Sequence, residues 1–172
     1  MKKLLITLFL ITTIPLTAAV WNPAIEAGIG YRASFVAEDD RLWSSLNLYA
    51  VADAAAVKLG ERHTLSFPLM LSFTSESSEN DRLTLPYTAG GTLSIRYGFK
   101  FTERIEASLS SGASLIFHLR QRAVSWGFNA SASLSIAINR YLAVTIPIRY
   151  ELRRALSSFS LSAGIKYIPG GF

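Results

Sequence analysis

The chain has 172 residues, a formal net charge of +5 and a pI of about 9.7, and half of its residues are hydrophobic. Only 17% are charged, against roughly a quarter in an average soluble domain. The basic residues are scattered, without the aromatic-interleaved patch that nucleic-acid binding requires, so we expect no nucleic-acid partner. The absence of cysteine excludes disulfides, thiolate metal sites and an acceptor for an N-terminal lipid.

The first twenty residues have the pattern of an export signal. Lys2 and Lys3 precede an apolar run over residues 4–16, which small residues follow up to Ala19. A basic start, a short apolar stretch and a small-residue site predict a signal peptide over 1–19 and a mature domain over 20–172. The alternative, a membrane anchor, would need about 20 apolar residues.

The mature chain contains eight segments in which apolar and polar residues alternate, as in strands whose two faces meet different surroundings. They are Ala24–Ala37, Leu42–Leu59, His63–Thr74, Leu83–Phe101, Ile105–Leu119, Val124–Ile138, Tyr141–Leu152 and Leu156–Ile168. Tight connections (60–62, 102–104, 139–140) alternate with longer ones (38–41, 75–82, 120–123, 153–155). This order predicts an all-β fold, an eight-stranded antiparallel up-and-down barrel in a single domain.

The two faces of the strands differ in size as well as in polarity. One face is bulky and carries no charge, whereas the other is rich in Gly, Ser and Thr. The second face carries the charged residues Glu26, Arg32, Asp53, Arg96, Lys100, Glu106, Arg149, Glu151 and Lys166.

The size difference decides which face points inward. The interior of an eight-stranded barrel is just wide enough for side chains to fill, so small residues with a few long charged ones suit the inside. The bulky face then contacts lipid, which predicts a transmembrane barrel and disfavours a soluble carrier with an apolar lumen.

The aromatic residues of the bulky face fall into two groups, as in the aromatic girdles of membrane barrels. One group lies near the tight turns and contains Trp21, Phe99, Phe101, Tyr141 and Tyr167, and the other lies near the longer loops and contains Phe35, Trp43, Phe73, Phe117, Trp126 and Phe159.

The interior charges must be paired or hydrated, because an isolated buried ion costs several kcal/mol. Lys100 and Glu106 are symmetric about a tight turn and are expected to face each other. Glu26 and Lys166 lie on the first and last strands, which are neighbours in a closed barrel. Arg149 and Glu151 share a face. We interpret these charges as a structural plug; the alternative is a charged constriction along a narrow conduit.

Three prolines interrupt predicted strands, and proline removes a ladder hydrogen bond. We expect bulges or strand ends at Pro68, Pro86 and Pro147. The parity of the second strand is ambiguous over 54–59.

These features resemble the small eight-stranded bacterial outer-membrane barrels of the OmpA/OmpX/OmpW-like group, over essentially the whole mature chain. The resemblance extends to an aromatic last residue, Phe172. It implies a monomer in the outer membrane, with both termini in the periplasm and the four longer loops outside. Its partners would be outer-membrane lipid and the barrel assembly machinery, which would read Phe172. The sequence does not identify a surface ligand.

Two small barrels of this kind, a lipid A palmitoyltransferase and a deacylase, are enzymes that use His, Ser and a carboxylate. Here His63 adjoins a tight turn, while His118 lies near the loop end with Ser114 on the same face. No carboxylate is evident beside that pair, and no metal spacing or phosphate loop occurs, so we expect no enzyme and no cofactor. The predicted role is structural or in envelope interactions. The alternatives are a narrow channel for small or hydrophobic solutes, as in OmpW-like proteins, and then a lipid-modifying enzyme.

Overall fold

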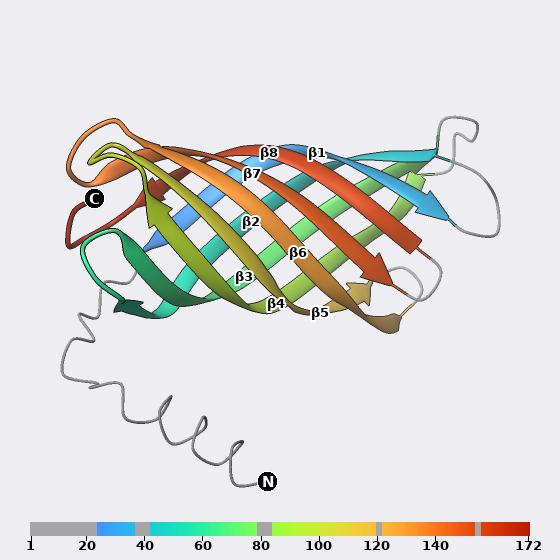
Figure 1. Ribbon diagram of the computed structural model, residues 1–172. Coiled ribbons are helices and arrows are strands. Elements are labelled where there is room, and N and C mark those ends of the chain that lie inside the picture. The colour runs from blue at the N-terminus through green and yellow to red at the C-terminus, as the bar shows by residue number, and fades with distance from the viewer. Residues whose placement is uncertain (1–23, 37–41, 79–83, 120–121, 154–155) are drawn as a thin grey trace, which may run out of the picture.

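The computed structural model describes residues 24–36, 42–78, 84–119, 122–153 and 156–172. They form one closed antiparallel barrel in the strand order β1-β2-β3-β4-β5-β6-β7-β8 (Figure 1). The strands are β1 Ile25–Val36, β2 Leu42–Lys58, β3 His63–Ser78, β4 Thr84–Lys100, β5 Ile105–His118, β6 Ala123–Ala137, β7 Leu142–Arg153 and β8 Leu156–Tyr167. The predicted signal peptide, the domain boundary after Ala19 and Trp21 lie outside the described residues.

The small polar face of the strands points into the barrel and the bulky face points outward, as the size of the side chains predicts. In β8, Ser158, Ser160 and Lys166 are buried inside the barrel, while Phe159 and Leu161 are about half exposed on its outer wall. The pattern continues around the barrel, with Leu109 64% exposed and Trp126 79% exposed. A wall of exposed Leu, Ile, Phe and Tyr around a polar interior is the reverse of a soluble protein. The predicted transmembrane type of barrel is therefore confirmed. No helix among the described residues is long and apolar enough to cross a membrane.

Tight turns join the strands in pairs at one end, the turn end, where the C-terminus also lies (Figure 1). Two of these turns are fixed by a side chain that accepts hydrogen bonds from the backbone that follows. Thr102 Oγ1 accepts from the amides of Arg104 and Ile105, at 3.2 and 3.1 Å. Asn139 Oδ1 accepts from the amides of Tyr141 and Leu142, at 2.8 and 2.9 Å. Short polar side chains of this kind stabilise turns by replacing backbone partners.

The hairpin β3–β4 is longer than predicted. The sequence indicated a loop from Ser75, but β3 continues to Ser78 and β4 begins at Thr84. Ser75 pairs with Tyr87 and Ser77 with Thr84. The polar run was assigned to a loop by its composition, whereas pairing with β4 extends the strand.

Two of the three prolines lie at bulges and the third does not. Opposite Pro68 the register between β2 and β3 shifts between Asp53 and Ala56, which accounts for the ambiguous parity of residues 54–59. The β3–β4 register shifts between Ser75 and Ser77, where β4 contains Pro86. Both positions are bulges, as expected. The expectation for Pro147 is wrong, because β7 runs straight through it without a change of register: its ladder with β8 omits that position and resumes at Ile148.

Candidate functional site: the barrel interior

The nine charged side chains predicted for the interior all lie on the inward parity of their strands. Most are buried, and Arg96, Lys100 and Glu151 are half-buried. Arg153 joins them at 8% exposure. The sequence analysis missed it by assigning it to a loop, although it has the same parity as Glu151. The interior of the described barrel thus carries four acids and six bases.

The ion pairs of the interior connect strands that are not adjacent in the sheet. Three of them join Arg32 to Glu151 (3.0 Å), Arg96 to Asp53 (3.5 Å) and Lys166 to Glu106 (3.3 Å). These contacts link β1 with β7, β4 with β2, and β8 with β5. In a barrel this narrow, long side chains reach across the lumen to one another.

The strand register places the expected charged residues opposite each other, but the ion pairs that form between side chains are different ones. Lys100 is opposite Glu106, and Glu26 is opposite Lys166, in the strand ladders. The Glu106 carboxylate nevertheless accepts from Lys166, and the Lys100 ammonium lies 5.0 Å from the centre of the Phe172 ring. Arg149 does not form an ion pair with Glu151 among the described residues; its guanidinium lies 3.9 Å from the centre of another aromatic ring.

That ring belongs to Tyr49, which lies near the middle of β2 and is buried in the barrel interior. Its hydroxyl donates to the Glu26 carboxylate at 2.9 Å, and Thr145 donates to the same carboxylate oxygen at 3.1 Å. With Arg149 stacked on the ring, these four buried side chains form what we call the crossbar. Sequence analysis missed Tyr49, although its parity matches that of Asp53.

Glycine makes room for the crossbar. Gly28 of β1 and Gly164 of β8 are direct partners in the ladder. A Cβ atom on Gly28 would lie 2.6 Å from the Tyr49 hydroxyl, and one on Gly164 would overlap the same oxygen and lie 2.7 Å from the Ala27 carbonyl. The hydroxyl of Tyr49 thus occupies volume that side chains at these two positions would need.

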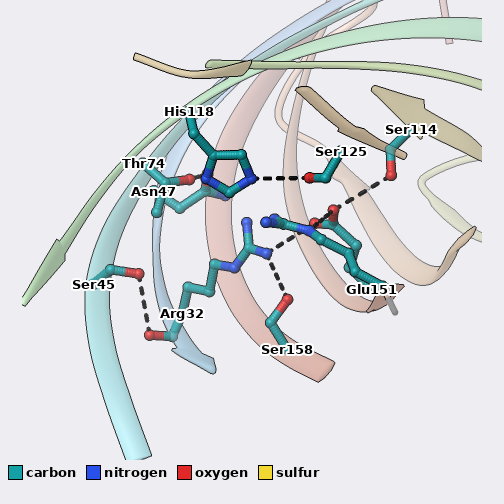
Figure 2. Close-up of polar contacts among 10 residues, drawn as sticks. Arg32, Ser45, Asn47, Thr74, Ser114, His118, Ser125, Glu151 and Ser158 are labelled. Carbon is teal, nitrogen blue, oxygen red and sulfur yellow. Dashed lines mark hydrogen bonds and ion pairs between the residues drawn. The ribbon is translucent and has the colours of Figure 1, made fainter. Parts of the chain in front are cut away.

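A second polar cluster fills the interior toward the loop end (Figure 2). Glu151 accepts from Arg32, from Arg153 Nε at 2.8 Å and from Ser114 Oγ at 3.3 Å. Arg32 also donates to Ser158 at 2.6 Å. The single carboxylate therefore pairs with two guanidinium groups at once, and these three side chains together keep one net positive charge.

His118 belongs to the same end of the barrel, but it does not pair with Ser114 as the sequence suggested. Its Nε2 lies 2.9 Å from Ser125 Oγ, while Ser114 donates to Glu151. Figure 2 shows the opposite edge of the imidazole directed toward Thr74 and Asn47. The other histidine, His63, lies 2.5 Å from the Tyr97 hydroxyl through Nδ1, near the turn end. No group of three potential metal ligands is found among the described residues.

At the turn end the barrel opens into a cavity of about 620 Å³, which we call the vestibule. A smaller chamber of about 70 Å³ lies further in, beside the Asp53–Arg96 and Lys166–Glu106 pairs. Phe172 lines both spaces, as does Lys100. The Phe172 amide donates to the Arg140 carbonyl at 2.7 Å. The predicted assembly residue thus lies in the mouth of the barrel, against an interior lysine.

The predicted aromatic girdles lie on the outer wall. The described members are between 40% and 79% exposed, except Phe99, which is half-buried against Phe101 and His63. The side chain of Trp43 and the whole of Trp21 lie outside the described residues. The described members on the wall are Phe35, Phe73, Phe99, Phe101, Phe117, Trp126, Tyr141, Phe159 and Tyr167.

A closed eight-stranded barrel with an apolar wall and a charged interior defines a small β-barrel of the outer-membrane type. No protein-family model matches the sequence, and no curated protein matches it. Among solved structures, the chain is similar to Neisserial surface protein A, with 14% identity, a TM-score of 0.59 and coverage of 84% of this chain and 96% of that one.

Two further structures show the same fold. Ail, the attachment invasion locus protein of Yersinia pestis, is 11% identical with a TM-score of 0.55, covering 86% of this chain and 98% of its own. The outer membrane enzyme PagL is 13% identical with a TM-score of 0.54, covering 84% and 98%. The predicted resemblance to small outer-membrane barrels is confirmed at the level of the fold, and this fold supports the predicted location in the outer membrane.

Proposed function

We propose that this protein is a non-conducting outer-membrane barrel with a structural or envelope-interaction role, and that its charged interior is a core rather than a passage. The crossbar carries the proposal, because Tyr49 of β2, Glu26 of β1 and the β7 residues Arg149 and Thr145 meet inside the barrel and are all buried there. The Glu151 cluster fills the interior on the loop side, and Phe172 stands in the mouth on the turn side.

A second candidate, a narrow conduit, has one observation in its favour. Four small inward residues of β5 and β6 are only half-buried: Ser110, Gly112, Ser131 and Ser133. A strip of small side chains leaves more room than the Tyr49 side of the barrel, although Ser110 and Ser131 approach each other at 2.6 Å. This strip is where ions would pass if the barrel conducted.

Single-channel recording in planar bilayers tests the choice between these functions. We expect the folded wild-type protein to give no unit conductance steps, and Phe172→Ala also to be silent because the crossbar remains. Tyr49→Ala combined with Arg149→Ala removes the crossbar and is expected to produce steps. Folding of each variant is checked by its heat-modifiable migration in SDS gels. Reproducible wild-type steps that change in Ser131→Leu would contradict the proposal and favour the conduit.

The proposed role does not include catalysis. The His118–Ser125 contact is the arrangement in the described interior that most resembles a base and a nucleophile. Its surroundings are hydroxyl and amide groups, and Glu151, the carboxylate of this region, is engaged by two arginines. We propose instead that this cluster stabilises the loop end, on which the envelope role depends.

A further inference from the structure

The three tight turns at the turn end share a feature that the proposed function does not use. Each carries an arginine one or two residues before the next strand begins: Arg62, Arg104 and Arg140. All three line the vestibule, together with Lys100 on its inner side. The repetition brings three arginines from three separate hairpins to the lining of one cavity of about 620 Å³, with the Arg140 guanidinium also 5.6 Å from the centre of the Tyr141 ring.

These arginines are not neutralised by acidic neighbours. No ion pair between described residues involves any of them. The acids that line the vestibule are Glu61 and Glu103, so its side chains carry four positive and two negative charges. The balance stays positive if the chain ends at Phe172 and adds a carboxylate there. Deeper in, the smaller chamber adds Lys58, which likewise has no ion pair among the described residues.

The chemistry of guanidinium groups narrows the class of ligand. Arginine presents a planar fork of donors that matches phosphate and carboxylate oxygens. Three forks around one cavity favour a ligand whose acceptors point in several directions, which phosphate groups provide and a single carboxylate does not. A cavity of this volume is within the range of small-molecule sites, roughly 300–1,000 Å³. Concave walls of one charge sign also raise the local concentration of oppositely charged solutes.

We propose that the vestibule is a binding site for an anion that carries two or more phosphate groups, held by Arg62, Arg104 and Arg140. The phosphates belong either to a soluble compound or to phospholipid headgroups beside the turn end. Glu61 and Glu103 weaken the site by repulsion. This inference is independent of conduction, because the vestibule lies outside the crossbar.

Isothermal titration with tripolyphosphate, on the folded protein in phosphatidylcholine nanodiscs, tests the proposal. We expect saturable binding that weakens with added salt. Arg62→Gln/Arg104→Gln/Arg140→Gln should bind at least about tenfold more weakly, since each tenfold corresponds to 1.4 kcal/mol and charged hydrogen bonds contribute on that scale. Glu61→Gln/Glu103→Gln should bind several-fold more tightly, a gain that a purely structural role for these turns does not produce. Arg122→Gln, an exposed arginine at the loop end, is the matched control and should bind as the wild type does.

A second arm identifies the source of the phosphates. If nanodiscs containing phosphatidylglycerol or cardiolipin compete with tripolyphosphate in the wild type, and not in the triple arginine variant, the headgroups are the ligand. If the lipid composition has no effect, the ligand is a soluble phosphate compound. The proposal is overturned if wild-type binding is not saturable at millimolar tripolyphosphate, or if the folded triple variant binds as tightly as the wild type.

Discussion

Replacing Glu151 by Gln is expected to lower the free energy of unfolding by about 3–5 kcal/mol, the usual cost of removing one partner from a buried ion pair. The Glu151 carboxylate forms ion pairs with both Arg32 and Arg153, whose side chains are only 7% and 5% exposed. The amide keeps the volume of the side chain but removes its charge, so two buried guanidinium groups lose their counter-ion. The Nη1 and Nη2 atoms of Arg153 have no hydrogen-bond partner among the described residues, so this arginine depends on its Nε contact.

Urea titration of the protein in lipid vesicles measures this loss, with tryptophan fluorescence reporting when Trp126 leaves the lipid. Glu61→Gln removes the same charge at an exposed position and should change stability by no more than about 0.5 kcal/mol. Replacing Arg32 and Arg153 by Met and Glu151 by Leu together should restore most of the lost stability, because this cluster then contains no buried charge. Equal stability of wild type and Glu151→Gln would mean that the cluster is hydrated.

Gly164→Ala is expected to destabilise the barrel by about 2–3 kcal/mol through overpacking. The added methyl would overlap the Tyr49 hydroxyl and lie 2.7 Å from the Ala27 carbonyl. Gly91→Ala is the control within the same barrel, because a Cβ there has no neighbour within 4 Å. It should be neutral or slightly stabilising, since alanine costs less backbone entropy than glycine.

A double-mutant cycle isolates the contact with Tyr49. Tyr49→Phe alone removes the hydroxyl that donates to Glu26, so it should destabilise the wild type. In the Gly164→Ala background the same change also relieves the overlap, and its net cost should fall or reverse. Strictly additive effects of the two substitutions would show that Tyr49 does not lie against Gly164.

The faces of the strands could be predicted from the sequence because period-two alternation and side-chain size both act locally. The burial of Arg32 and Lys166 and the exposure of Leu109 follow from parity alone. Parity was ambiguous over 54–59, where a bulge opposite Pro68 changes it, and the register shifts again between Ser75 and Ser77. A bulge depends on the pairing of two strands, so one strand read by itself does not locate it.

The partners within the interior could not be predicted in the same way. Sequence reasoning pairs residues on neighbouring strands, so Glu106 was assigned to Lys100 rather than to Lys166. In the barrel, Lys166 reaches Glu106 across two intervening strands. Which long side chains meet depends on the curvature and shear of the closed sheet. The vestibule arginines could have been found from the sequence, because each of the three predicted tight turns ends in an arginine.

The most direct test of the central claim, an apolar wall in lipid around a closed polar interior, is solid-state NMR magnetisation transfer in bilayers. Transfer from lipid chains should be strong to Leu109 on the wall and weak to Arg149 in the crossbar. Transfer from water should be weak to Tyr49 and Arg149 and strong to Thr102 at the vestibule. Strong water transfer to Tyr49 and Arg149, equal to that at Thr102, would contradict the closed interior. Strong water transfer and no lipid transfer at Leu109 would contradict the orientation of the barrel itself.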